Sequence, residues 1–246
     1  MANTSELAKH NAALAALPYI RPGMTVGLGT GSTANIFVDL LAARERREHL
    51  GLKCIATSEN SEKQAARAGL RLVSFADAPM IDVVVDGADI VSADFCLLKG
   101  LGGALLREKC VAYRSKKFIV LVGEEKLRRK LEGIVPIEVL PFAAPAVLRE
   151  ISKLSKRAKL RTAAAGRPFI TDNGNYIIDA PMRVSNPAKL EAELKYLPGV
   201  LETGIFTRAD IVLVGNKTGC RTLKNKKQAR PLLLTCSCLA KQLDCF

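Results

Sequence analysis

The sequence lacks tryptophan, and only 5% of its 246 residues are aromatic. No apolar run approaches the roughly 18 to 20 residues that a membrane-spanning helix needs, so a transmembrane protein is excluded. The segment 1–17 lacks the basic flank and apolar block of a secretory signal. Apolar residues make up 48% and charged residues 25%, a balance that argues against disorder. We therefore expect a soluble, cytoplasmic protein of one large domain or two small ones.

The cysteines form no disulfide or metal-binding pattern. Cys54, Cys96 and Cys110 lie among apolar residues, where a free cysteine behaves as a small hydrophobe. The pair Cys236 and Cys238 has neither a second pair nor a nearby histidine, so no zinc site is expected. This usage fits a reducing compartment, and we expect neither a metal nor a cofactor.

Acidic residues are few relative to basic ones, and the net charge is +13. Such an excess suggests an anionic partner. However, segment 217–246 alone holds seven basic residues and one acid, together with four of the seven cysteines. We treat it as an atypical basic tail. Because no aromatic side chains for stacking lie between its basic residues, we do not expect it to bind nucleic acid.

Strands and helices alternate up to about residue 125, which is typical of a doubly wound, mostly parallel α/β sheet. Short apolar strands are expected at 24–28, 53–56, 70–74, 81–85 and 118–122. The run at 81–85 is continuously apolar, as in a central strand that is buried on both faces.

Beyond Pro136 the order changes to strand, helix, hairpin, helix, strand, which predicts a small inserted α+β domain of ferredoxin-like type. The expected hairpin pairs 169–171 with 176–179. The predicted organisation is a catalytic α/β domain over 1–133 and 208–216, an inserted domain over 134–207, and the tail.

Three loops carry candidate functional residues at the carboxyl edge of the sheet, where ligands bind in open α/β folds. The first, Gly29 to Thr33, has the composition of a phosphate cradle, because glycines admit an anion to the free N–H groups of a helix N-terminus. No Gly-Lys-Ser/Thr follows, which excludes a P-loop. A tight turn with a helix cap and a loose dinucleotide pattern, typical of an oxidoreductase, remain alternatives.

The other two loops supply acids and an amine. Asp86 and Asp89 could bind sugar hydroxyls or a metal, or act in acid–base chemistry; a helix cap with a turn is the alternative. Lys99 would project into the same cleft, with Glu108 on the helix that follows. For Glu108 the alternative is a solvated helix face shared with its charged neighbours Arg107 and Lys109.

Four motifs together resemble ribose-5-phosphate isomerase, type A, in order and spacing over residues 6–215. They are Gly27-Leu-Gly-Thr-Gly-Ser-Thr33, Val85-Asp-Gly-Ala-Asp89, Lys99-Gly-Leu-Gly-Gly-Ala-Leu-Leu-Arg-Glu-Lys109 and Thr171-Asp-Asn-Gly-Asn175. The resemblance implies metal-free interconversion of ribose 5-phosphate and ribulose 5-phosphate in the non-oxidative pentose phosphate pathway. It also implies this sheet with its inserted domain, and a homodimer or homotetramer.

Residue by residue, the resemblance makes Glu108 the general base, while Asp86, Asp89 and Lys99 handle ring opening and the reacting oxygens. It implies substrate binding by Lys9, Thr30, Gly31, Ser32, Thr33, Gly87, Ala88, Gly100, Leu101, Gly102 and Lys126. Leu101 stands where many relatives have glycine, Ile90 replaces an acid, and the tail does not resemble the family's short C-terminus. A non-catalytic sugar-phosphate-sensing domain, which would need neither Glu108 nor Lys99, is the alternative function.

Overall fold

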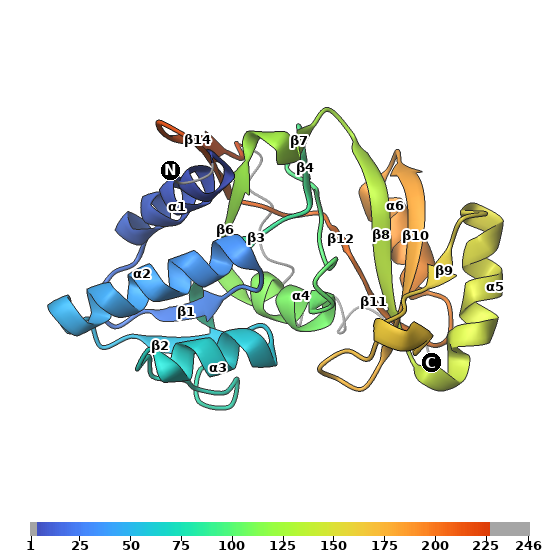
Figure 1. Cartoon of the computed structure of the whole chain (residues 1–246), viewed down its shortest axis with the longest axis horizontal. Helices are drawn as coiled ribbons and strands as arrows, with labels where there is room; N and C mark the ends of the chain where they lie inside the picture. Colours follow the sequence, from blue (N-terminus) through green and yellow to red (C-terminus); the bar gives the residue numbers. More distant parts are fainter. Residues whose placement is uncertain (1–3, 227–246) are drawn as a thin grey trace, which may run out of the picture.

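A computed structural model describes residues 4–226, in which the main body is a six-stranded sheet (Figure 1). Its order is β14-β13-β6-β3-β1-β2, and only the β13–β14 pair is antiparallel. The strands are β1 (Thr25–Leu28), β2 (Lys53–Ala56), β3 (Ile81–Gly87), β6 (Ser115–Gly123), β13 (Ile211–Asn216) and β14 (Gly219–Lys224).

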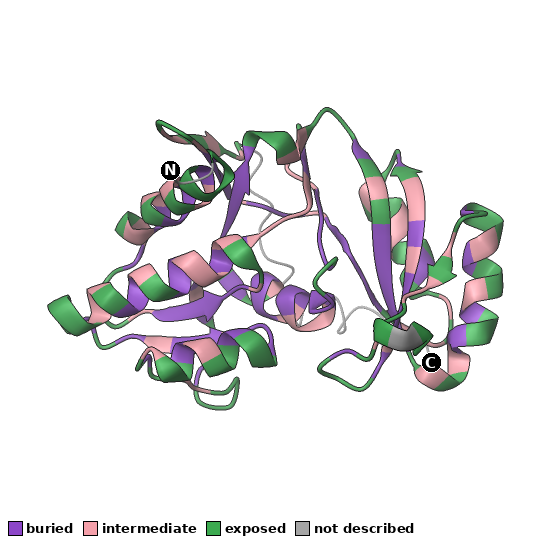
Figure 2. Ribbon diagram, in the orientation of Figure 1, coloured by how far each residue is buried: buried purple, intermediate pink, exposed green. Residues whose placement is uncertain are grey.

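Helices cover both faces of this sheet, so its central strands are buried on both sides (Figure 2). The helices are α1 (Thr4–Ala16), α2 (Ser32–Glu48), α3 (Glu59–Arg67) and α4 (Leu105–Tyr113). Because side chains alternate along a strand, Val83 and Val85 of β3 pack in the core with α1 and α2, whereas Val84 packs in the core that includes Val111 of α4. The continuous apolar run of β3 is thus explained.

The inserted unit is a second, antiparallel sheet with two helices. Its elements are β8 (Leu131–Val139), α5 (Ala144–Leu154), β9 (Lys159–Leu160), β10 (Tyr176–Val184), α6 (Pro187–Lys195) and β11 (Val200–Thr203). The order β11-β8-β10-β9 follows from the strand–helix–strand–strand–helix–strand sequence of a ferredoxin-like unit. Its core contains Ile137 of β8, Ile151 of α5 and Leu194 of α6.

A third sheet of four short strands lies between the two units (Figure 1). Its order is β12-β5-β4-β7, formed by β4 (Ile90–Ser92), β5 (Leu97–Leu98), β7 (Leu127–Arg128) and β12 (Ile205–Phe206). Single helical turns complete the described chain: η1 (Leu17–Tyr19), η2 (Glu124–Lys126), η3 (Pro141–Ala143) and η4 (Ala164–Gly166). The third sheet matters for the site because Lys99 directly follows β5.

The predicted fold class is confirmed, but local expectations differ in three places. Segment 70–74 contributes only an isolated bridge from Leu72 to Cys54, and 169–171 forms no strand. The composition changes at residue 217, yet the sheet continues through β14, because main-chain pairing with β13 does not require an apolar sequence. The remainder of the tail, 227–246, lies outside the described residues, and the domain limits stay predictions. In residues 4–226 no helix is long and apolar enough to cross a membrane.

Candidate active site

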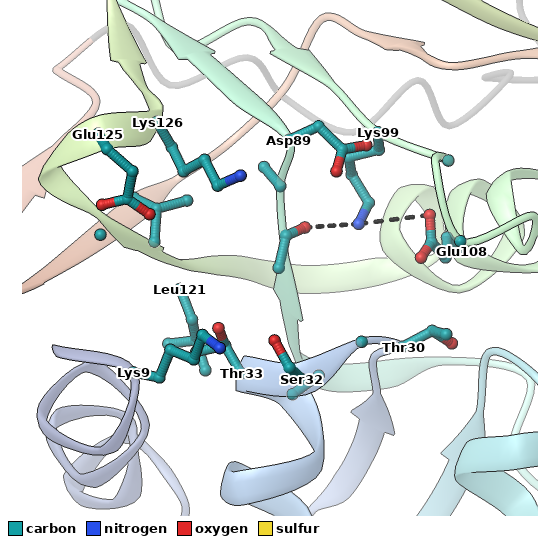
Figure 3. Close-up of a pocket in the computed structure, with 18 of the residues that line it drawn as sticks. Lys9, Thr30, Ser32, Thr33, Asp89, Lys99, Glu108, Leu121, Glu125 and Lys126 are labelled. Carbon is teal, nitrogen blue, oxygen red and sulfur yellow. Dashed lines mark hydrogen bonds and ion pairs between the residues drawn. The ribbon is translucent and has the colours of Figure 1, made fainter. Parts of the chain in front are cut away.

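A cavity of about 380 Å³ opens at the carboxyl ends of β1 and β3, between α1, α2 and α4 (Figure 3). Most residues that the sequence pointed to line it, although they come from distant segments. These are Lys9, Thr30, Gly31, Ser32, Thr33, Gly87, Ala88, Asp89, Lys99, Gly100, Gly102, Glu108 and Lys126. Leu101 does not: its side chain is exposed, and only its backbone N–H takes part, donating to Asp89 Oδ2 at 3.1 Å.

Three buried charged side chains meet at one end of this cavity. The ammonium of Lys99 lies 3.1 Å from Asp86 Oδ2. It also lies 3.3 Å from Glu108 Oε2 (Figure 3). No more than 5% of any of the three side chains is exposed to solvent. The alternative for Glu108, a solvated helix face, is therefore wrong, because α4 presents this side chain to the interior. We call Asp86, Lys99 and Glu108 the buried charge cluster.

Backbone groups hold Asp86 in place. Its Oδ1 accepts hydrogen bonds from the N–H groups of Thr30, at 3.0 Å, and Gly87, at 2.7 Å. Gly29 permits this approach, since a Cβ there would lie 2.2 Å from Asp86 Oδ1. The first loop is therefore bonded to the second, and this contact requires both the carboxylate of Asp86 and the glycine at position 29.

The third sheet positions Lys99. The N–H of Lys99 donates to Gly204 O at 2.9 Å, in continuation of the β5–β12 pairing. Gly204 is required there because a Cβ would lie 2.2 Å from Lys99 O. The side-chain ammonium then donates to Gly87 O at 2.5 Å. The lysine is thus fixed at both its backbone and its tip.

Burial and the mutual charges of the three groups shift the pKa values of the buried charge cluster. Burial raises the pKa of Glu108 to about 8, even though the neighbouring Lys99 ammonium lowers it. Burial likewise raises the pKa of Asp86, against the opposing charge of Lys99. For Lys99, burial alone would lower the pKa, but the charges of the two carboxylates outweigh it and raise the pKa. Because Asp86 also accepts two N–H bonds, Glu108 is the carboxyl group better suited to gain and lose a proton near neutral pH.

The other end of the cavity is a cradle for an anion. α2 begins after Gly31, whose φ of 114° only glycine adopts readily, and no side chain caps this helix. The first N–H groups of α2 therefore face the cavity, where they can bind an anion. Lys9 of α1 and Lys126 of η2 line the same region (Figure 3). Thr30 lines the cavity, but its N–H is bonded to Asp86 and its hydroxyl to Thr57 and Ser58.

Some lining residues were not found from the sequence. Ser5, Ala34, Leu121, Val122, Gly123 and Glu125 also line the cavity. Glu125 stands next to Lys126 in Gly-Glu-Glu-Lys and could have been noticed; the apolar residues belong to the end of β6 and carry no local signal. Within the described part of the chain, no cluster of three or more His, Cys, Asp or Glu side chains is arranged to hold a metal ion.

Comparisons with known proteins agree on one family. A family model described as ribose 5-phosphate isomerase A (phosphoriboisomerase A) matches residues 53–219. Ribose-5-phosphate isomerase A of Methanoregula boonei is 40% identical over 231 residues, which cover 91% of this chain and 97% of that protein. The protein of the same name from Methanocaldococcus jannaschii is 42% identical over 225 residues, 90% of this chain and 99% of its own.

Solved structures give the same result. The structure of ribose 5-phosphate isomerase A from Methanocaldococcus jannaschii superimposes with a TM-score of 0.86 at 41% identity, and covers 90% of this chain and all of that one. A ribose-5-phosphate isomerase in complex with phospho-erythronic acid gives a TM-score of 0.84 at 40% identity, over 91% of this chain and all of that one. The chain belongs to the ribose-5-phosphate isomerase A family, and with it to the aldose–ketose isomerases.

Proposed function

We propose that this protein interconverts D-ribose 5-phosphate and D-ribulose 5-phosphate through an enediol(ate), with Glu108 as the general base. One observation carries the proposal. The cavity joins an anion cradle at the start of α2 to a buried charge cluster in which a carboxyl group of raised pKa faces an ammonium group. A phosphorylated sugar that binds the cradle by its phosphate would present its other end to Glu108 and Lys99.

The proton transfer needs a single carboxylate. Aldose–ketose isomerisation moves a proton between adjacent carbons, so the same group can collect it from one carbon and return it to the other. Glu108 suits this role because its side chain lines the cavity while its buried Oε2 faces the Lys99 ammonium at 3.3 Å. Its raised pKa brings the carboxylate closer in basicity to the working pH.

Lys99 stabilises the charge that develops on the substrate oxygens. Removal of a proton beside the carbonyl leaves negative charge on oxygen, and a preorganised cation in a water-poor site stabilises that charge strongly. Lys99 is held as an ammonium by Asp86 and Glu108. We therefore propose that the reaction needs neither a metal nor another cofactor.

The two aspartates have different roles, because Asp89 lines the cavity and Asp86 lies behind Lys99. Asp89 lines the cavity, and its Oδ2 accepts the N–H of Leu101, which orients the carboxylate beside the charge cluster. We assign the opening of the furanose ring to it, while the fully buried Asp86 orients Lys99. Gly87, Ala88, Gly100 and Gly102 shape the wall around the sugar.

The phosphate end anchors the substrate. Gly31, Ser32 and Thr33 supply backbone and hydroxyl donors, and Lys9 and Lys126 supply positive charge. Binding energy from this unreacting end holds the reacting carbons against Glu108. The complex of a relative with phospho-erythronic acid supports this placement, because a phosphorylated acid suits a cavity with an anion cradle at one end and an ammonium at the other.

The cellular setting follows from the same proposal. We place the enzyme in the cytoplasm, in the non-oxidative pentose phosphate pathway, as a homodimer or homotetramer. The free thiols of Cys54, Cys96, Cys110 and Cys220 support a reducing compartment.

The test is direct turnover by the purified full chain. Ribose 5-phosphate is added, ribulose 5-phosphate formation is followed, and the assay is repeated after treatment with EDTA. We expect turnover that EDTA leaves unchanged. Binding of ribose 5-phosphate without turnover would contradict the proposal in favour of a sugar-phosphate sensor. A loss of activity that an added divalent metal restores would contradict the metal-free reaction.

A further inference from the structure

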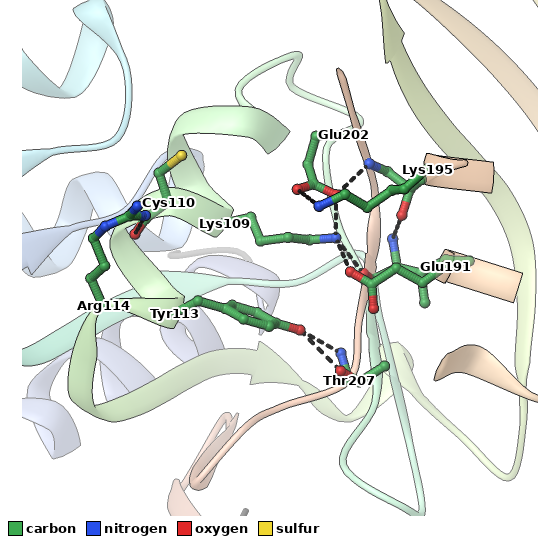
Figure 4. Close-up of polar contacts among 10 residues, drawn as sticks. Lys109, Cys110, Tyr113, Arg114, Glu191, Lys195, Glu202 and Thr207 are labelled. Carbon is green, nitrogen blue, oxygen red and sulfur yellow. Dashed lines mark hydrogen bonds and ion pairs between the residues drawn. The ribbon is translucent and has the colours of Figure 1, made fainter. Parts of the chain in front are cut away.

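Glu108 lies between two charged residues that both contact the inserted unit. Lys109, for which a solvated helix face was the alternative, is only 4% exposed. Its ammonium forms ion pairs with Glu191 Oε1 of α6 at 2.6 Å and Glu202 Oε1 of β11 at 2.8 Å, and donates to Ile205 O at 2.8 Å (Figure 4). One buried lysine on α4 therefore contacts three successive parts of the unit's C-terminal half.

The same segment of chain also fixes Lys99. Gly204 lies two residues after Glu202 and next to Ile205, and its carbonyl oxygen accepts the N–H of Lys99. The ring of Phe206 then lies between the two amines, with its centroid 5.6 Å from Lys99 Nζ and 4.9 Å from Lys109 Nζ. Residues 202–206 thus contact Lys99 on one side and the residue after Glu108 on the other.

A second, weaker contact lies on the other side of Glu108. Arg107 donates from Nε to Asn173 Oδ1 and from Nη2 to Asp172 O, each at 2.9 Å, near solvent. The loop that it contacts is rigidly built, because the buried carboxylate of Glu138 accepts side-chain hydrogen bonds from Thr171, Asn173 and Asn175. The Thr171-Asp-Asn-Gly-Asn175 motif lies outside the cavity lining, and this contact gives it a link to α4.

We infer that the inserted unit positions Glu108 against Lys99, and that Lys109 is the positioning residue through which it does so. The inference rests on the proposed function of Glu108. Ion pairs on Lys109 fix the rotation and height of α4 relative to β11 and β12, while Gly204 fixes Lys99 to the same segment. The gap of 3.3 Å between Lys99 Nζ and Glu108 Oε2 is then set by one short piece of chain.

Stability alone does not account for this arrangement. A buried ion pair costs desolvation energy that its attraction often barely offsets, and an apolar residue of similar size can serve stability equally well. The directional contacts of Lys109 with Glu191 and Glu202 also fix the position of α4, and with it the position of Glu108. Reactions are sensitive to it, since a shift of about 1 Å in a reacting group can cost about 100-fold in rate.

The test compares two lysines that bind the same carboxylate. Lys109→Met removes the ion pairs between α4 and the inserted unit. Lys195→Met instead removes a lysine of α6 whose side chain is 43% exposed and whose ammonium lies 2.8 Å from Glu202 Oε2. In the full chain we expect Lys109→Met to lower kcat about 100-fold, with KM and the inhibition constant of inorganic phosphate within about twofold. Lys109→Arg keeps the positive charge that pairs with Glu191 and Glu202, so its kcat should lie above that of Lys109→Met. Lys195→Met should match the parent.

Each other outcome has a defined meaning. A folded Lys109→Met variant with the parent's kcat would overturn the inference, as would an equal loss in Lys195→Met. If Lys109→Met does not fold, Glu191→Gln weakens the same contact more gently and should lower kcat about tenfold; an unchanged kcat in that folded variant would overturn the inference. An inactive parent would instead refute the proposed function, so the two failures are distinguishable.

Discussion

The two ends of the cavity are built in opposite ways. At the reacting end, Asp86, Lys99 and Glu108 are almost completely buried and bonded to one another. At the phosphate end, Lys9 keeps 26% of its side chain exposed and pairs with Glu6, whose side chain is 58% exposed. The Lys9–Glu6 contact is a surface pair of the kind that contributes little.

The difference indicates a division of work. The reacting end has its charges in place before a substrate arrives, and their desolvation raises the pKa of Glu108. The phosphate end instead offers the first N–H groups of α2 and the partly exposed charges of Lys9 and Lys126, which a strongly charged ligand can organise. We therefore expect changes at the reacting end to reduce kcat, and changes at the phosphate end to alter KM.

Removal of Lys99 should have a large effect on the reacting end. Lys99→Met takes away the cation that faces the developing charge, so we expect kcat to fall about 100- to 1000-fold. Steady-state kinetics and inhibition by inorganic phosphate would measure this, with the phosphate constant within about twofold of the parent. A folded variant that keeps kcat within about threefold would show that charge stabilisation comes from elsewhere.

The pH dependence tests the same end without a mutation. Glu108 works as a base only when ionised, and burial raises its pKa to about 8. Below that pH the protonated form predominates, so kcat/KM should fall about tenfold for each pH unit on the acid side. The profile should be recorded at constant ionic strength. A rate that stays flat down to pH 5 would contradict a base with a raised pKa.

The smallest effects are expected at the phosphate end. Lys126→Met should raise KM about tenfold, equivalent to about 1.4 kcal/mol, and leave kcat within about twofold. Glu125→Gln is the control of opposite sign, because this exposed carboxylate lines the same cavity and repels a phosphate; KM should fall. A kcat loss in either variant that matches that of Lys99→Met would remove the distinction between the two ends.

Much of the site could be predicted because it follows strand ends. Gly29–Thr33 directly follows β1, and Asp86–Asp89 spans the end of β3. Because β1 and β3 are parallel neighbours, the rule for open sheets brings the two segments together. Lys99 was predicted from its loop to project into the same cleft, but its exact position depends on β5 and β12, which are too short to give a periodic signal.

The burial of individual charged and apolar side chains could not be predicted, because it depends on contacts between segments that are distant in the sequence. The partners of the buried Lys109 are Glu191 and Glu202, which lie more than 80 positions further along the chain. The local sequence shows only neighbouring charged residues on a helix, so a solvated helix face remained the alternative. Leu101 was expected to bind substrate through its place in a motif, yet its side chain is exposed. Tertiary contacts, rather than local pattern, decide which charged residues are buried.

The central claim is that one buried carboxylate carries the proton. The measurement that tests it most directly is turnover of ribose 5-phosphate by Glu108→Gln beside Glu125→Gln, a second carboxylate of the same cavity. We predict that Glu108→Gln lowers kcat at least about 1000-fold. The variant should still bind inorganic phosphate, as the parent does. Glu125→Gln should keep the parent's kcat. A folded Glu108→Gln variant that turns over at a rate close to the parent's would contradict the account.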